Sequence, residues 1–308
     1  MGILEPNRPI PVLDPVNDGR HKLRDLPLER ESIPYVVSLP EHGVGAFIYT
    51  WVTKDSLAGS ALVAFGPGIE KPVAEKVDGV KVPLDKNFDD WAVGSVHLKQ
   101  DLKLQHAEIA SKGERMSFEC TFDALHPAYA YSSHPDGCPD WAATDRLEQA
   151  GRLKGSLTID GKVFPVDTTC ARDHSWGVRD WGVPQHWKWL HAQSDDTCVH
   201  FWDIQARGKN ALRGYISRDG VMAEVTRIEV DFTVDDNYVQ KTIEAVVHDT
   251  AGRKVKVVGE YFGYFPFHPE PTCTLNEAAM KCTVDGKPGR GWSEFMWPTQ
   301  YIDYLRSA

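Results

Sequence analysis

Short runs rich in aromatic and β-branched residues recur along the whole chain, and almost no stretch has the period of a long helix. Several runs alternate apolar and polar residues, as antiparallel strands with one buried face do. Turn dipeptides separate them, and Asp160-Gly161 is a strong hairpin signal. We expect a hairpin at 151–169 and strands at 44–53, 60–65, 91–100, 102–109, 115–124, 186–193, 198–206, 211–217, 223–234, 241–249, 254–265 and 272–284.

Strands that are this short and this evenly spaced favour barrels or sandwiches. The length of 308 residues favours two of them. The sequence therefore predicts an all-β protein made of two tandem antiparallel β-barrels with few short helices. We expect an N-terminal barrel with an irregular lead-in over 1–165 and a C-terminal barrel over 166–308. Short helices are expected at 140–149 and in the terminal WPTQYIDYLRS.

The composition excludes several classes of partner. The formal net charge of −10 repels phosphate backbones and anionic lipid heads, so we expect neither nucleic acid nor membrane insertion. The proline-rich start lacks an apolar signal core, so we expect a cytoplasmic protein. The cysteines form no CxxC pair, and we expect them to be reduced and mostly buried.

The stretch CARDHSWGVRDWG, residues 170–182, concentrates cations, anions, an imidazole and two indoles. If residues 170–176 form a strand, Arg172, His174 and Trp176 share one face. Asp173 then lies on the other face, where we expect it to pair with Arg179 or with backbone donors. One face would present a guanidinium, an imidazole and an indole, which is a plausible wall for a cavity.

A structural interpretation stays open beside the catalytic one. Buried Arg–Asp pairs can lock two domains together without taking part in chemistry. Cys170 has no evident base and is expected to be a buried thiol. His186, His191 and His200 invite a metal interpretation, but their spacing fits no compact ligand set. A site elsewhere, around His97, His106 and His126, is a further alternative. No dinucleotide or phosphate-loop motif is present, so we expect no cofactor. No cysteines or histidines have the spacing of a compact ligand set, so we expect no metal.

The run ARDHSWGVRDW, preceded by DRLEQAGRLKGSLTIDGKVFPVD and followed by GRGWSEFMWP, resembles the AttH-like and carotenoid-hydratase-like group over about residues 30–300. The resemblance implies two lipocalin-like β-barrels in tandem with a ligand pocket between them. It also implies cofactor-free chemistry on hydrophobic molecules, such as hydration, cyclisation and ring closure. By position it points to Arg172, Asp173, His174, Trp176 and Glu294. Glu148 also falls at a family position, but Leu147 replaces the aromatic residue that relatives often carry beside it.

The residues and the resemblance together suggest an enzyme that moves protons. Cofactor-free hydration or double-bond migration needs an acid or base in a dry pocket, and tryptophan faces can stabilise a developing cation. We expect His174, Asp173 and Glu294 to handle the proton and Arg172 to orient a polar group. The expected walls are aromatic: Trp176, Trp181, Trp189, Tyr129 and Tyr131.

The hypothesis is a cofactor-independent lyase or isomerase, such as a hydratase or dehydratase. Its substrate would be a hydrophobic terpenoid, steroid, polyketide or aromatic alcohol, and a homodimer is allowed for. The rival hypothesis is a lipocalin-like carrier that holds a hydrophobic molecule without chemistry. Buried ionisable groups favour the enzyme, because a carrier needs few of them.

Overall fold

The structure is a computed structural model that describes residues 4–307. The chain forms two compact β units, which are described separately. The N-terminal unit comprises residues 11–130 and 142–179, and the C-terminal unit comprises residues 4–10, 131–141 and 180–307. None of the helices in the described part of the chain is long and apolar enough to cross a bilayer.

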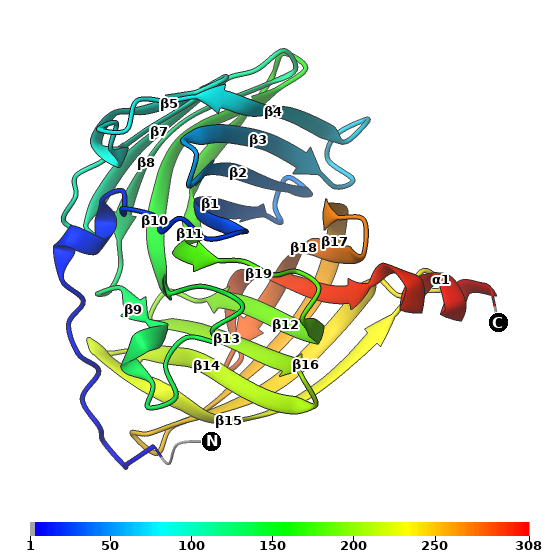
Figure 1. Cartoon of the computed structure of the whole chain (residues 1–308). Helices are drawn as coiled ribbons and strands as arrows, with labels where there is room; N and C mark the ends of the chain where they lie inside the picture. The colour runs from blue at the N-terminus through cyan, green and yellow to red at the C-terminus, as the bar shows by residue number, and fades with distance from the viewer. Residues whose placement is uncertain (1–3, 308) are drawn as a thin grey trace. The chain divides into compact units, whose positions relative to one another are not determined.

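The N-terminal unit is a single 11-stranded sheet (Figure 1). Its order is β4-β3-β2-β1-β11-β10-β8-β7-β6-β5, and β9 pairs with β10. The pairs between neighbours are antiparallel. The strands are β1 (Glu29–Leu39), β2 (Val44–Thr53), β3 (Leu57–Phe65), β4 (Val73–Lys81), β5 (Trp91–Val93), β6 (Val96–Gln100), β7 (His106–Lys112), β8 (Met116–Ala124), β9 (Tyr129–Ala130), β10 (Asp145–Ile159) and β11 (Lys162–Val178).

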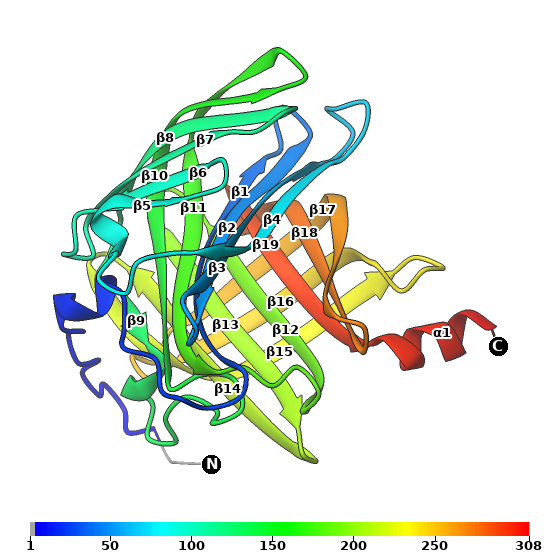
Figure 2. The same ribbon diagram turned by 45° about the horizontal axis from the view of Figure 1, so that its top comes forward.

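This sheet curls so that its two ends approach each other (Figure 2). Ser60 of β3 donates its hydroxyl proton to the carbonyl oxygen of Val93 in β5 at 2.8 Å, which joins strands from opposite ends of the order. Alternate residues of β1, such as Tyr35, Val37 and Leu39, point into an apolar core that strands from both halves of the sheet share. Two 3-10 turns belong to this unit, Pro15–Asp18 and Phe88–Asp90.

The C-terminal unit is a closed antiparallel barrel in the order β12-β13-β14-β15-β16-β17-β18-β19, and β12 also pairs with β19. Its core lies inside the barrel and includes Leu190, Phe201, Ile243 and Phe295. Its elements are a 3-10 turn (Tyr131–Ser133), β12 (Pro184–Gln193), β13 (Thr197–Ala206), β14 (Lys209–Arg218), β15 (Val221–Val234), β16 (Gln240–Asp249), β17 (Lys254–Glu270), β18 (Cys273–Val284), β19 (Lys287–Pro298) and α1 (Thr299–Ser307).

The all-β fold, the terminal helix and the expected strands are confirmed, with a few differences. The helix expected at 140–149 is wrong, because β10 begins at Asp145 and its residues form ladders with β11. Four further strands, β1, β4, β9 and β19, were not expected. In β1, Pro34 hides the strand signal because proline lacks a ladder donor, and the β1–β11 pairing lapses between Ser32↔Ser175 and Tyr35↔Arg172.

The chain passes between the units after Arg179, whereas the sequence analysis places the boundary at 165. Residue 165 lies inside β11, which starts from the tight turn at Asp160 and Gly161, both with positive φ. Because β11 pairs along its length with β10 and β1, the whole motif strand stays in the N-terminal unit.

Candidate active site

The predicted strand at 170–176 is confirmed as the second half of β11, at the centre of the N-terminal sheet between β1 and β10. Its side chains alternate as expected. Arg172 contacts Phe122 of the apolar core, and the ring of His174 lies 5.3 Å from that of Trp176. Asp173 and Ser175 contact a different set of groups.

Arg172 is buried, with 1% of its surface exposed, and the protein occupies its donors. Both Nε and Nη2 donate to Gln149 Oε1, at 3.0 and 2.8 Å, and Nη1 donates to Gln100 Oε1 at 2.8 Å. An ion pair of 3.0 Å joins Nη1 to Asp18. Burial would lower the pKa of Arg172, but Tyr35 and Asp18 outweigh burial and raise it. Arg172 therefore stays charged and holds the lead-in against the sheet.

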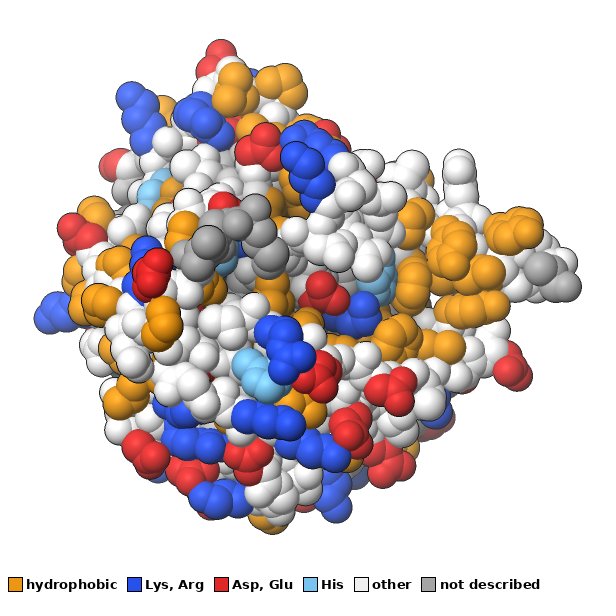
Figure 3. All heavy atoms as spheres, turned by 90° about the horizontal axis from the view of Figure 1, so that it is seen from below, with side chains coloured by type: hydrophobic (Ala, Val, Ile, Leu, Met, Phe, Trp, Pro, Cys, Tyr) orange, Lys and Arg blue, Asp and Glu red, His pale blue; other side chains and the backbone are white. Residues whose placement is uncertain are grey.

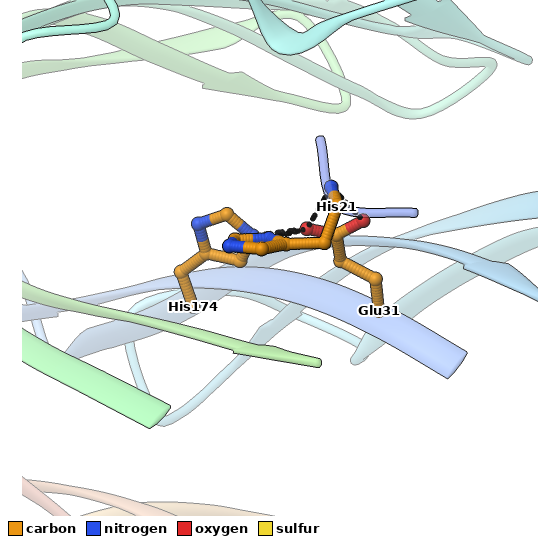
Figure 4. A group of neighbouring side chains, drawn as sticks. All are labelled: His21, Glu31 and His174. Carbon is orange, nitrogen blue, oxygen red and sulfur yellow. Dashed lines mark hydrogen bonds and ion pairs between the residues drawn. The ribbon is translucent and has the colours of Figure 1, made fainter. Parts of the chain in front are cut away.

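His174 belongs to a cluster with His21 and Glu31, which we call the His21–Glu31–His174 cluster (Figure 4). Glu31 lies on β1, His174 on β11, and His21 in the lead-in before β1. Oε1 of Glu31 lies 2.7 Å from His174 Nε2 and 2.7 Å from His21 Nδ1. The backbone N–H of His21 also donates to both carboxylate oxygens, at 3.1 and 3.0 Å. One carboxylate thus holds two imidazoles.

Hydrogen bonds set the charge of the carboxylate, and burial sets the charge of His174. Burial would raise the pKa of Glu31, but the hydrogen bonds from His174 and His21 outweigh it and lower the pKa. Burial lowers the pKa of His174 despite the opposing bond to Glu31. Glu31 is therefore ionised near neutral pH and His174 is neutral, with its proton on Nε2. Nδ1 of His174 is then a bare acceptor, and it has no hydrogen-bond partner among the described residues.

Both ring nitrogens of His21 face oxygen acceptors. Its Nδ1 faces Glu31, and its Nε2 lies 3.1 Å from Asn17 Oδ1. Asn17 is oriented by its own Nδ2, which donates to the carbonyl of Asp14. Two acceptors are both satisfied only when both ring nitrogens carry protons. The ring of Trp176 stacks on His21 with 3.6 Å between centroids and 8° between planes, an arrangement that suits a cation.

The opposite face of β11 holds an ion-pair network. Asp173 pairs with Arg146 at 2.7 Å, and the same guanidinium pairs with Glu148 at 2.6 Å. Arg146 reaches Asp173 because β10 pairs with the motif strand. Arg179 donates to Ser175 and to the carbonyl of Ala142. Glu148 and Asp173, which both fall at positions that the resemblance singles out, therefore pair with the same guanidinium, that of Arg146.

Tyr129 is fully buried on β9, beside Glu148 of β10. Tyr131, the other tyrosine expected in the wall, lies outside this strand, because β9 ends at Ala130 and Tyr131 begins a 3-10 turn of the C-terminal unit. There the Tyr131 hydroxyl donates to His200 Nε2 at 2.9 Å, since His200 Nδ1 donates to the carbonyl of Leu190.

The other predicted site residues lie in the C-terminal unit. Glu294 of β19 accepts a hydrogen bond of 2.6 Å from the indole of Trp187 and is the ladder partner of Trp189. Trp181 lies 5.7 Å from Trp187 between ring centroids. Glu294, Trp181 and Trp189 belong to a different unit from His174.

Sequence reasoning missed His21, Glu31 and Asp18. For Glu31 a signal existed: alternate residues Ile33, Tyr35 and Val37 are buried, so the same face extended backwards includes Glu31. A carboxylate on the core face of a strand needs a buried partner. No comparable signal marks His21, because it lies in a segment without regular periodicity.

The histidines weighed as an alternative site are held by separate partners. His97 pairs with Asp90, and His106 pairs with Asp123, both on exposed surface. His126 is buried against backbone groups. No hydrogen bond or ring contact among the described residues joins the three.

A metal was also considered for the cluster. His21, Glu31 and His174 place one ligand atom each within 4.8 Å of one another, and imidazoles with a carboxylate suit a transition metal. The two nitrogen–oxygen separations of 2.7 Å are hydrogen-bond lengths. Ligand atoms bound tetrahedrally to one zinc ion lie about 3.3 Å apart. The geometry is that of a proton-sharing cluster.

Comparisons with known proteins agree with this architecture. A family model described as "Domain of unknown function (DUF7064)" matches residues 14–299. No curated protein sequence matches the chain significantly.

Solved structures share the fold at low sequence identity. A protein described as an AttH from Nitrosomonas europaea is 14% identical, with a TM-score of 0.69, over 95% of this chain and 99% of its own. Kievitone hydratase from Nectria haematococca is 13% identical, with a TM-score of 0.58, over 96% and 95%. CghA, solved with Sch210972, is 11% identical, with a TM-score of 0.62, over 88% and 89%. The resemblance to the AttH-like and carotenoid-hydratase-like group is confirmed for the fold.

Proposed function

Because the chain belongs to the family described as a domain of unknown function, DUF7064, we propose its function from its fold and its own chemistry. We propose that the protein is a cofactor-independent lyase or isomerase. It would add or remove water, or move a double bond, on a hydrophobic small molecule. The shared fold with kievitone hydratase supports this class, since a protein of that name acts on a small molecule by hydration chemistry.

The observation that carries the proposal is the single carboxylate oxygen shared by two imidazoles. Glu31 holds a neutral ring on one side and a doubly donating ring on the other. A base and an acid are thus kept side by side by one buried anion. Pairs of titratable groups driven to different protonation states mark the acid and base of many enzymes.

In this proposal His174 and His21 have different roles. His174 Nδ1 takes a proton while Glu31 stabilises the imidazolium that forms. His21 gives a proton to a leaving hydroxyl or to an alkene carbon. With 19% of its side chain exposed, His21 is the member of the cluster that reaches the surface, whereas Glu31 and His174 are fully buried. Asp173 and Glu294 are assigned positioning roles through Arg146 and Trp187.

The surroundings suit an apolar substrate. Trp176 stacks on His21, and Phe88 meets His174 edge to face at 5.3 Å. Such rings exclude water, and their faces stabilise a carbocation-like state. A carrier without chemistry remains the rival. It would not require a charged cluster of three groups in this region.

The first experiment extracts and identifies the hydrophobic molecules that co-purify with the protein. The recovered compound is then incubated with protein in deuterated water, and deuterium incorporation is followed by mass spectrometry. We expect enzyme-dependent incorporation that falls by at least about 100-fold in His174→Gln and in Glu31→Gln, the usual size of general acid–base catalysis. His97→Gln is the matched control, because His97 lies outside the cluster and should keep the wild-type rate.

Either result of this exchange decides between the hypotheses. Bound compound without exchange would favour the carrier. Exchange lost in His97→Gln but kept in His174→Gln would move the site to the alternative histidines. Circular dichroism of each variant separates a lost base from a lost fold.

A further inference from the structure

A cavity of about 680 Å³ opens at one end of the C-terminal barrel. None of its lining residues belongs to the His21–Glu31–His174 cluster. The cavity is formed where the start of β12 meets the end of β19 and the first turn of α1. Its lining includes several aromatic side chains, among them Trp181, which the sequence analysis expects in a ligand wall. Besides Trp181, the aromatic members are Phe232, Trp297 and Tyr301.

Among the polar residues that line this cavity, His186 and Lys188 lie on the same face of β12. Both point to the barrel interior: His186 lies 4.0 Å from Trp297 between ring centroids, and the ammonium of Lys188 lies 5.3 Å from Phe232. Residues two apart on a strand are separated by about 7 Å. The cavity therefore offers two polar groups at a defined spacing on an aromatic wall.

His186 is held in one tautomer. Its Nδ1 lies 2.6 Å from the carbonyl oxygen of Met296, so Nδ1 carries the proton and donates. Burial lowers the pKa of His186 to about 3, and the charge of Lys188 contributes, so the ring is neutral. Nε2 is therefore an acceptor. This atom is buried, since only 7% of the residue is exposed, and it has no hydrogen-bond partner among the described residues. A buried acceptor without a donor costs free energy that a ligand hydroxyl would recover.

Lys188 supplies the opposite kind of group. Its side chain is 10% exposed, and its one hydrogen bond within the described structure is a long contact of 3.5 Å to Asp203. An ammonium has three donors, so further acceptors can be bound. Because Asp203 partly balances the charge, a carbonyl, phenolate or single carboxylate is a suitable partner.

We propose that the mouth of the C-terminal barrel binds a planar aromatic molecule with a hydroxyl group at one end and a carboxylate or carbonyl oxygen at the other. The hydroxyl donates to His186 Nε2, and the oxygen at the far end accepts from Lys188. Trp297, Phe232 and Tyr301 contact the ring system. Tyr301 lies on α1, and a hydrogen bond of 2.9 Å from Arg306 to the carbonyl of Asn237 holds this helix in place. Figure 3 shows hydrophobic side chains gathered beside α1 on this face of the molecule.

The test measures binding of 6-hydroxy-2-naphthoic acid to the full-length protein by calorimetry. Two truncated probes accompany it: 2-naphthoic acid, which lacks the hydroxyl, and 2-naphthol, which lacks the carboxylate. We expect the hydroxy acid to bind about 10-fold more tightly than 2-naphthoic acid, the value of one hydrogen bond. In His186→Phe that preference should vanish, and in Lys188→Met the preference for the acid over 2-naphthol should vanish. Lys209→Met, an exposed lysine outside the cavity, is the control.

Equal affinity of wild type for the hydroxylated and unsubstituted acids would overturn the proposal, as would a preference retained in His186→Phe. The proposal would also be overturned if Lys188→Met bound the hydroxy acid and 2-naphthol with the same affinities as the wild type. If His186→Phe does not fold, the Lys188→Met comparison still decides the outcome. Binding is measured without turnover, so its failure is distinguishable from failure of the proposed enzyme activity.

Discussion

Arg172 shows how a residue of the motif can be charged, buried and fully engaged. Its guanidinium donates to Gln149 and Gln100 and pairs with Asp18. Removing one partner of a buried ion pair leaves the other charge without compensation. The sequence leaves open whether Arg172 orients a substrate group or has a structural role, and its contacts are those of an anchor for the lead-in that carries Asp18 and His21.

We expect Arg172→Met to lower the free energy of unfolding by about 3–5 kcal/mol, because Asp18 is left as an unpaired buried anion. Urea denaturation followed by tryptophan fluorescence measures the change. The double variant Arg172→Met with Asp18→Asn should lose less than the sum of the two single variants. Arg207→Met, in an exposed pair with Asp140, should change stability by less than about 0.5 kcal/mol. Additive losses would argue against the pairing.

His186 makes stability depend on pH in a defined direction. Its folded pKa is about 3, whereas an unfolded histidine has a pKa of about 6.5. Between these values the unfolded chain binds a proton that the folded chain refuses, so stability falls as pH falls. The contribution of this group approaches about 1.4 kcal/mol for each pH unit.

We therefore expect His186→Phe to flatten the stability profile between pH 6.5 and pH 5. Urea denaturation at pH 7, 6 and 5 gives the slope of the free energy of unfolding against pH for the wild type and for the variant. The slope of the variant should be smaller by about 1 kcal/mol for each pH unit. His134, whose pKa burial lowers to about 4, produces a similar slope and remains in both proteins. Parallel profiles for variant and wild type would contradict the assignment of a neutral His186.

At the scale of elements, the β10–β11 hairpin combines a turn with a close contact to β8. Gly161 has φ +80° and open space around its missing side chain. Gly155 has φ +147°, and a Cβ there would lie 2.0 Å from the carbonyl oxygen of Glu119 and 2.7 Å from the Cα of Cys120. Both glycines require an unusual backbone, but only Gly155 also faces a neighbouring main chain.

The two glycines should therefore respond differently to alanine. We expect Gly161→Ala to cost about 1 kcal/mol, from backbone strain alone. Gly155→Ala should cost about 3 kcal/mol or more, because the β8 backbone must move as well. Thermal denaturation of the two variants side by side tests the order. Similar losses would mean that β8 yields easily at this point.

On the whole-molecule scale, the cysteines report how tightly both units are packed. Five are buried: Cys120, Cys170, Cys198, Cys273 and Cys282. Burial raises the pKa of Cys120 to about 12, and it does the same for Cys198 and Cys282. Thiols with such pKa values carry almost no thiolate, the reactive form, near pH 8. Cys138 is half-exposed.

We expect native protein at pH 8 to react rapidly with a disulfide reagent at Cys138, while the five buried thiols react only after unfolding. Absorbance of the released thiolate measures both phases. In Cys138→Ser the rapid phase should disappear and the slow one should stay. A second rapid thiol in the native protein would show that one of the units opens easily.

The sequence by itself determined the all-β class, the tandem arrangement, the terminal helix and the alternation of Arg172, His174 and Trp176 along one strand. These follow from the two-residue period of a strand and from turn chemistry, which are local properties. Only the tertiary structure decided which partners those side chains meet.

Glu31 lies 143 positions from His174 in the chain, and His21 comes from a segment with no periodic signal. Likewise Asp173 pairs with Arg146, which β10 brings beside it. The passage between units after Arg179 has the same origin. Strand pairing joins residues distant in sequence, and no local pattern specifies which strands become neighbours.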